Sequence, residues 1–148
     1  MRTLCTALVL LLQAPAWAQS APPLAPGATE GEKFKLINVK ELEDLIKEGK
    51  VQIYDANTES FRAKEGMIAG AHALSHIRTF DTSTELPQDK GTPLVFYCVS
   101  THCTCSHMAA SRAIEAGFTQ VSVLSEGLMG WKKAGMKSVP AASAHGLK

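Results

Sequence analysis

The chain has 148 residues, with 15 Lys and Arg against 14 Asp and Glu, so its formal charge at pH 7 is +1. Hydrophobic residues make up 45% of the sequence and charged residues 20%, which is the composition of a globular protein large enough for one core. Because charges of both signs are interspersed, the sequence has no basic cluster that would bind a nucleic acid or a membrane surface. A small molecule or a protein is therefore the expected partner.

The amino terminus has the pattern of a secretory signal. One Arg precedes an apolar run from Leu4 to Leu12, and a small-x-small triplet ends at Ala18. We therefore expect residues 1–18 to be a signal peptide and the protein to be exported. No segment is both long and apolar enough to predict a membrane span. Residues 19–32, rich in Pro, Ala and Gly, predict a flexible leader.

Short strands and helices alternate from residue 33 onwards. Asn38 and Glu41 form a capping-box pattern at the start of a helix that Gly49 ends. The other elements predicted in the first half are, in chain order, an edge strand at 34–37, a strand at 51–56 that carries Asp55, a short helix at 57–66 with Phe61 turned inward, and a small-residue strand or loop at 67–75.

The second half continues the alternation. Residues 78–93 are polar and turn-rich, which predicts a connection with room for one surface helix. The uninterrupted apolar run PLVFYCV at 93–99 predicts a fully buried parallel strand with Cys98 at its carboxyl end. The remaining predicted elements are a helix from Ser106 to Gly117, a strand at 120–125, a short helix at 126–135 holding Trp131, and a loose tail at 138–148.

This alternation predicts an α/β fold. We expect one domain over residues 33–137, with a parallel central sheet of about five strands and helices on both faces.

Three cysteines follow the signal: Cys98, Cys103 and Cys105. An exported protein meets an oxidising compartment that favours disulfides, but three thiols cannot all pair within one chain. A bridge across so short a loop would also remove little entropy from the unfolded chain. The pattern therefore indicates chemically active thiols rather than a structural disulfide.

Cys98 stands where open α/β sheets bind their ligands, between the carboxyl end of a strand and the start of a helix. Backbone N–H groups in such a loop form an anion site and lower the pKa of a thiol, so we expect Cys98 to be largely thiolate at neutral pH. Ser106 is predicted to cap the following helix and to donate to the loop. The residues predicted to bind substrate are Val99, Ser100, Thr101, His102, Cys103, Thr104, Cys105 and Ser106.

The order and spacing of these segments over residues 33–137 resemble the rhodanese-like sulfurtransferases. YDANTESFRAKEGMIAGA is similar to the family's Asp-x-Arg and Gly-His-Ile-Pro-Gly-Ala segments, and LVFYC to its catalytic-cysteine strand. SHMAASRAIEAGF and VSVLSEGLMGWKKAG are similar to the helix, Gly-Phe turn and Gly-Trp end that follow. With its exported leader, the chain is most similar to single-domain rhodaneses of the bacterial periplasm.

The resemblance implies a reaction and roles for individual residues. Cys98 would take sulfane sulfur from a small anionic donor such as thiosulfate, hold it as a persulfide, and pass it to a thiol, cyanide or a protein acceptor without a cofactor. Asp55 would support the structure, and Cys103 is a candidate resolving thiol. The sequence departs from the family in the loop, which lacks the usual Gly and Arg, and at Asn57, which replaces an Arg.

Two other readings remain open, and the sequence argues against a third. His102, Cys103, Cys105 and His107 form a soft nitrogen and sulfur set that suits zinc or copper(I). Without the loop Arg, the domain could also be a non-catalytic binding module, a sulfur carrier or a redox sensor. A phosphatase of the related cell-cycle type needs an Arg at the end of the loop, and Arg112 lies too far along the helix for that role.

Overall fold

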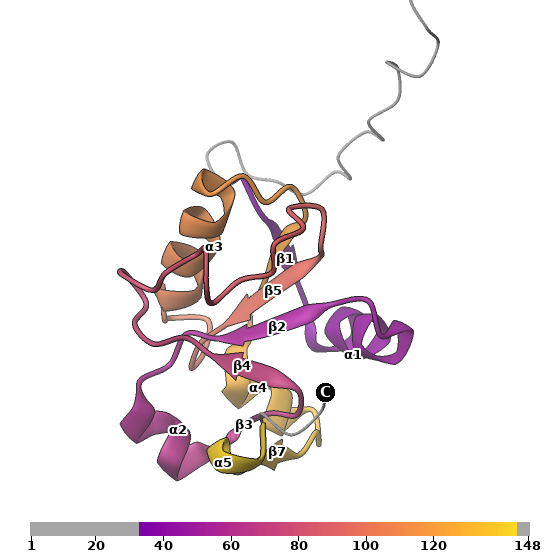
Figure 1. Ribbon diagram of the computed structural model, residues 1–148. Helices are drawn as coiled ribbons and strands as arrows, with labels where there is room; N and C mark the ends of the chain where they lie inside the picture. Colours follow the sequence, from indigo (N-terminus) through magenta and orange to yellow (C-terminus); the bar gives the residue numbers. More distant parts are fainter. Residues whose placement is uncertain (1–32, 145–148) are drawn as a thin grey trace, which may run out of the picture.

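The computed structural model describes residues 33–144, which form an α/β fold around one parallel sheet (Figure 1). In spatial order its strands are β1 (Lys35–Ile37), β6 (Val121–Leu124), β5 (Leu94–Tyr97), β2 (Gln52–Asp55) and β4 (Ala71–Ala73). Every neighbouring pair is parallel, which confirms the predicted sheet of about five strands. The predicted signal peptide and leader, and the last four residues of the chain, lie outside the described residues.

Helices cover both faces of this sheet, as predicted. α3 (Cys105–Glu115) packs on one face, and α1 (Val39–Glu48) and α4 (Gly127–Lys133) contribute to the core on the other. Figure 1 shows α3 and α1 on opposite sides of the strands. α2 (Glu59–Glu65) follows β2, and its half-buried Phe61 packs against the core on the α1 side. No helix within residues 33–144 has both the length and the apolar character needed to cross a membrane.

α1 begins where the capping pattern predicts. The Asn38 side chain accepts a hydrogen bond from the Glu41 N–H at 3.0 Å, and the Glu41 carboxylate accepts one from the Asn38 N–H at 3.0 Å. The carboxylate of Glu126, directly before α4, accepts a hydrogen bond from the Val39 N–H at 2.9 Å. The amino termini of α1 and α4 are therefore held next to each other.

β5 divides its side chains between two cores. Leu94, Phe96 and Cys98 at its end face the core on the α3 side, whereas Val95 and Tyr97 face the core on the α1 side. None of these five side chains is more than 1% exposed. The strand lies between β6 and β2, which confirms the fully buried parallel strand and leaves Cys98 at the carboxyl edge of the sheet.

The polar connection at 78–93 contains turns and bends and no helix, so the surface helix expected there is absent from these residues. Side chains compete with helical hydrogen bonding in this segment: an Asp81 oxygen accepts from the Ser83 N–H at 2.8 Å, and an Asp89 oxygen accepts from the Gly91 N–H at 2.9 Å. Such local bonds stabilise turns in place of a helix.

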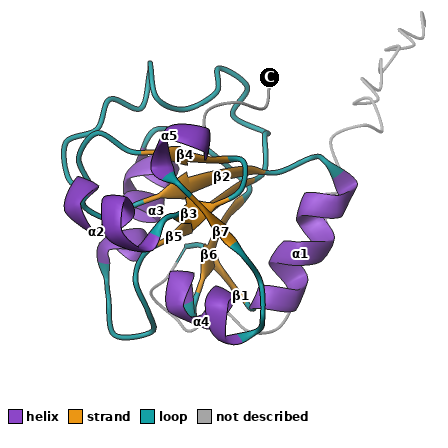
Figure 2. Cartoon of the chain, turned by 90° about the horizontal axis from the view of Figure 1, so that it is seen from below, coloured by secondary structure: helices purple, strands orange, loops and turns teal. Residues whose placement is uncertain are grey.

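Residues 138–144 are not part of the loose tail that we expected over 138–148; the last four residues lie outside the described range. β7 (Ser138–Val139) pairs antiparallel with β3 (Met67–Ile68), and α5 (Ala141–Ala144) contacts β3 and β4, an arrangement visible in Figure 2. This approach requires Gly66, which has a φ of 78° and where a Cβ would lie 2.6 Å from the Val139 carbonyl oxygen. The segment expected as one small-residue strand or loop thus contains two short strands, β3 and β4.

A buried polar network joins β2, β5 and β3. Asp55 is fully buried, and its carboxylate accepts hydrogen bonds from the Tyr97 hydroxyl and the Asn57 N–H, both at 2.6 Å. The Tyr97 oxygen accepts from the Ile68 N–H at 3.1 Å, and the Arg62 guanidinium lies 3.9 Å from Asp55. Burial raises the pKa of Asp55, although these partners oppose the shift. Asp55 therefore supports the framework behind the strand ends.

Replacing Tyr97 tests the importance of this network. Tyr97→Phe should lower the free energy of unfolding by about 2–4 kcal/mol, because a buried carboxylate oxygen and the Ile68 N–H lose their partner. Tyr54→Phe is the matched control: its hydroxyl donates to the side chain of Gln52, and its loss should cost less than about 1 kcal/mol. Urea unfolding followed by circular dichroism measures both free energies of unfolding. Equal losses in the two variants would contradict the role given to the Tyr97 hydroxyl in the buried network.

Candidate active site

The cysteine loop, residues 98–104, connects the carboxyl end of β5 to α3. The Cys103 N–H donates to the Ser100 carbonyl at 3.0 Å, which closes a turn within the loop. Cys98 lies at the base and is 1% exposed, whereas Cys103 and Cys105 are half-buried, and all three are free thiols. The loop thus gathers three sulfur atoms at the carboxyl edge of the sheet.

The amino terminus of α4 holds the cysteine loop from outside. The Leu128 N–H donates to the Cys98 carbonyl at 2.9 Å, and the Met129 N–H donates to the Val99 carbonyl at 3.0 Å. Gly127 makes this contact possible, because a Cβ there would lie 2.6 Å from the Val99 carbonyl carbon and 2.7 Å from the Cys98 oxygen. With these carbonyls turned outward, N–H groups of the loop are free to face inward.

Within the loop, the Cys98 thiol is surrounded by hydrogen-bonding groups. Its Sγ donates to the Cys103 carbonyl at 3.0 Å and lies 3.2 Å from the Ser106 hydroxyl. The backbone N–H of Ser106 also interacts with Cys98, while the N–H groups of Val99 and Cys105 interact with the Cys103 sulfur. The inward N–H groups are therefore divided between two neighbouring sulfur atoms.

The surroundings of Cys98 oppose the thiolate that we expect there. Burial raises the pKa of Cys98, and the neighbouring Cys103 adds to this shift. Burial also disfavours the Cys103 thiolate, but the interaction with the Cys98 side chain and hydrogen bonds from the N–H groups of Cys105 and Val99 outweigh it and lower the pKa of Cys103. Burial and Cys103 raise the pKa of Cys105 to about 11. The loop stabilises a thiolate on Cys103 instead.

Ser106 does not cap the helix as expected. α3 begins one residue earlier, at Cys105, and Thr104 occupies the cap position without a side-chain hydrogen bond. Ser106 is 1% exposed because it lies in the first helical turn with its hydroxyl next to the Cys98 sulfur. Its predicted contact with the loop is present, and its position inside the helix fixes that contact.

The other loop residues lie on the outside. Thr101, His102 and Thr104 are exposed, and Val99 and Ser100 are half-buried. The Thr101 hydroxyl lies 3.3 Å from the His102 ring nitrogen, so these side chains contact each other. The predicted substrate loop therefore contains an inner group of sulfur atoms with Ser106 and an outer group of polar side chains.

The four candidate metal ligands do not form one cluster. The His107 ring packs edge-on against Phe34, with ring centroids 5.2 Å apart, and His102 contacts Thr101. Among residues 33–144, no three His, Cys, Asp or Glu side chains are grouped so that they could hold a metal ion. The soft ligand set visible in the sequence therefore does not come together as one metal site in this part of the chain.

Sequence analysis assigned no role at the site to Gly127 or to the two N–H groups that follow it. The available signal was a glycine shortly after the end of a strand and at the start of a helix, in a fold whose strand ends share one edge. Arg78 was also missed, because it lies in the turn-rich connection and reaches the site only through the fold.

A parallel sheet with a thiol-bearing strand-to-helix loop at its carboxyl edge places the protein in the α/β class, with a candidate site on that loop. The sequence model of the rhodanese-like domain matches residues 38–134, and the chain belongs to this family. The match covers both the cysteine loop and the start of α4.

Solved structures show the same fold. Protein BH2092 from Bacillus halodurans is 21% identical, with a TM-score of 0.64 over 76% of this chain and 80% of that chain. A thiosulfate sulfurtransferase from Pseudomonas aeruginosa is 22% identical, with a TM-score of 0.57 over 70% of this chain and 20% of that chain. A human single-domain sulfurtransferase is 20% identical, with a TM-score of 0.55 over 66% of this chain and 95% of that chain. No curated protein matches the chain significantly.

The thiols should differ in their reactivity with iodoacetamide. At neutral pH a limiting amount should label Cys103 first, because its pKa is lowered and its side chain is half-buried, whereas Cys98 is almost fully covered. A lowered pKa preserves thiolate at more acidic pH, so acidification from about pH 8 to about pH 6 should suppress labelling of Cys105 and Cys98 before that of Cys103. Peptide mapping by mass spectrometry gives the order, and earlier labelling of Cys98 would contradict it.

Gly127→Ala tests the contact between α4 and the cysteine loop. A Cβ at this position would collide with the loop backbone, so the variant should lose about 1–3 kcal/mol more unfolding free energy than a variant with backbone strain alone. Gly135→Ala is that control, because Gly135 also has a positive φ, of 84°, but no atom lies within 4 Å of an added Cβ. Urea unfolding compares the two, and equal destabilisation would show that the close contact is unimportant.

Proposed function

We propose that the protein is a sulfurtransferase that carries sulfane sulfur as a persulfide on Cys98. The observation that supports this most is the position of Cys98, whose sulfur lies at the base of a loop with the Ser106 hydroxyl 3.2 Å away and with N–H groups directed at the neighbouring sulfur. Such N–H groups stabilise an anionic sulfur without a cation in the loop. Family membership supports the same chemistry.

In the first half-reaction, Cys98 attacks the outer sulfur of a small anionic donor such as thiosulfate. As the new bond to Cys98 forms, the Cys98 proton passes to Cys103, whose lowered pKa favours the thiolate that accepts it. A bond forms between the Cys98 sulfur and the sulfane sulfur, the sulfur–sulfur bond of thiosulfate breaks, and its electron pair leaves with sulfite. The N–H groups of Val99 and Cys105 then stabilise the terminal sulfur of the Cys98 persulfide.

In the second half-reaction, a thiolate or cyanide attacks the terminal sulfur of the persulfide. The bond to Cys98 breaks, the acceptor leaves as a persulfide or thiocyanate, and Cys98 becomes a thiolate that recovers its proton from Cys103. Cys103 thus holds the proton during the cycle, and it also stands where a resolving thiol would. A protein thiol is an equally suitable acceptor in this chemistry.

A redox function is the second candidate, and the interaction between the Cys98 and Cys103 thiols favours it. Two neighbouring thiols with opposite pKa shifts suit reversible disulfide formation, in which an oxidant removes two electrons and two protons. The two functions predict different mass changes on the same residue.

The site of action proposed here is outside the cytoplasm. The signal pattern of residues 1–18 supports export, with the bacterial periplasm as the proposed destination.

Intact-protein mass spectrometry tests the proposal. The reduced full chain should gain one sulfur atom, about 32 Da, on the Cys98 peptide after thiosulfate treatment, and cyanide should remove it. Cys98→Ser should abolish this gain, whereas Cys105→Ser should retain most of it, since the pKa of Cys105 is about 11 and it takes no part in the transfer.

Two outcomes would count against sulfur transfer. A loss of about 2 Da through a Cys98–Cys103 disulfide, without a gain of sulfur, would favour the redox function. A sulfur gain that persists in Cys98→Ser but disappears in Cys105→Ser would move the reactive sulfur and overturn the assignment of Cys98.

A further inference from the structure

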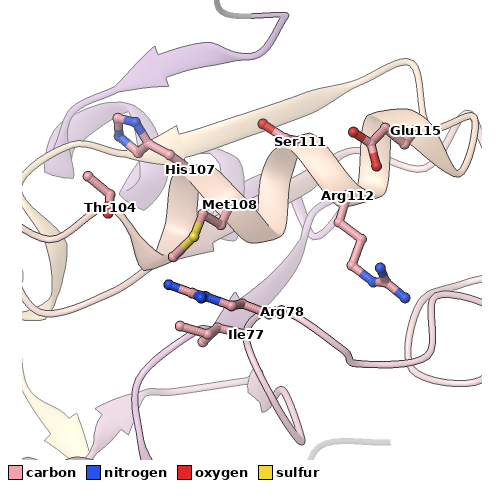
Figure 3. A pocket seen from close by; sticks show the side chains of 8 residues that line it. All are labelled: Ile77, Arg78, Thr104, His107, Met108, Ser111, Arg112 and Glu115. Atoms are coloured by element: carbon pink, nitrogen blue, oxygen red, sulfur yellow. The ribbon is translucent and has the colours of Figure 1, made fainter.

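A cleft of about 360 Å³ lies beside the cysteine loop, between α3 and the connection that follows β4. Figure 3 shows the side chains that line it. The cleft begins at Thr104, the last residue of the loop, and runs along α3 to Glu115. Its lining residues are Ile77, Arg78, Thr104, His107, Met108, Ser111, Arg112 and Glu115.

Two guanidinium groups and one carboxylate, that of Glu115, line the cleft, so its formal charge is positive. Figure 3 shows Arg78 extending beneath Met108 towards the Thr104 end, whereas Arg112 points towards the opposite end. Within residues 33–144, no carboxylate forms an ion pair with either Arg. The Arg112 Nε–H donates to the Phe80 carbonyl at 2.9 Å and its guanidinium lies over the Phe80 ring, which fixes the side chain and leaves its terminal nitrogens available.

Arg78 acts on the sulfur cluster as well as on the cleft. It is exposed, it lines the cleft together with Thr104, and its charge lowers the pKa of Cys105 against the larger opposing effects of burial and Cys103. The cysteine loop itself, residues 98–104, contains no Arg or Lys. Arg78 is therefore a cation brought to the loop from another part of the chain.

We propose that this cleft binds the sulfur acceptor, that the acceptor is a small thiol bearing carboxylate groups, and that Arg78 selects it. The proposal rests on the sulfurtransferase function proposed above. The cleft is larger than thiosulfate needs, and Ile77 and Met108 suit a carbon chain between the thiol and its carboxylates. Arg78 and Arg112 are cations suited to carboxylates, and the Thr104 and Ser111 hydroxyls add hydrogen-bonding capacity.

The chemistry at the reacting sulfur is that of the second half-reaction. The acceptor lies with its thiolate at the Thr104 end, next to the loop, and its carboxylates along α3. Its sulfur bonds to the terminal sulfur of the Cys98 persulfide, the bond to Cys98 breaks, and the electron pair remains on Cys98. Arg78 contacts the carboxylates, and within the sulfur cluster its charge acts on Cys105, whose thiol takes no part in the proposed transfer. It therefore affects which thiol is used and leaves the formation of the persulfide unchanged.

A series of thiols that differ in charge tests the proposal with the full chain and thiosulfate as donor. The anionic acceptor mercaptosuccinate should have a higher kcat/KM than neutral 2-mercaptoethanol, and cationic cysteamine the lowest. Arg78→Gln should reduce kcat/KM for mercaptosuccinate about tenfold, mainly by raising KM, and leave that for 2-mercaptoethanol unchanged. Lys50→Gln is the control, because it removes one exposed positive charge two residues before β2, at the amino ends of the strands and so at the opposite end of the sheet from the cysteine loop.

Binding without reaction supplies a second measurement. Succinate, which has no thiol, should shift the NMR signals of Thr104 and Met108 in the wild-type chain and in Lys50→Gln, but not in Arg78→Gln. Equal use of all three thiols, or equal losses for mercaptosuccinate and 2-mercaptoethanol in Arg78→Gln, would overturn the acceptor site while sulfur transfer stands. Failure of thiosulfate to load Cys98 would instead overturn sulfur transfer and, with it, the acceptor role of the cleft.

Discussion

The contact between the amino terminus of α4 and the cysteine loop is the constraint on which the site depends. Hydrogen bonds from Leu128 and Met129 turn the carbonyls of Cys98 and Val99 outward, and Gly127 lets the two backbones approach closely enough for this. A peptide group whose carbonyl points outward has its N–H on the other side, where the sulfur atoms lie. The anion-stabilising property of the loop thus comes from a helix that begins beyond the next strand, and Glu126 ties that helix to α1.

Two sulfur atoms share the space that these N–H groups enclose. Burial disfavours charge on Cys98, while the Cys98 thiol and two N–H groups favour charge on Cys103. A Cys103 thiolate next to the Cys98 thiol would place a charged sulfur beside an uncharged one. A persulfide anion on Cys98 has the same arrangement, because its outer sulfur carries the charge and its inner sulfur does not. The loop is therefore already arranged to hold an anionic sulfur next to Cys98, and it achieves this with N–H groups instead of the arginine that is common in the family.

Local patterns account for what the sequence predicted correctly. The Asn38 and Glu41 cap, the apolar run ending at Cys98 and the alternation of elements each depend on residues close together in the chain, and the structure confirms them. The pairing of β3 with β7, the support from Gly127 and the position of Arg78 depend on contacts between distant segments that no periodicity reveals. The two factors that raise the pKa of Cys98, its burial and the neighbouring Cys103, also depend on the fold and were not visible in the sequence.

The central claim is that Cys98 accepts sulfur from a donor in this loop, and its most direct test is the sulfite released in a single turnover. The full chain, reduced and mixed with excess thiosulfate in the absence of any acceptor, should release one sulfite per chain in a burst and then stop, because the persulfide cannot be discharged. Addition of cyanide should restart the release. An absence of the burst, or continuous sulfite release in Cys98→Ser, would contradict the account.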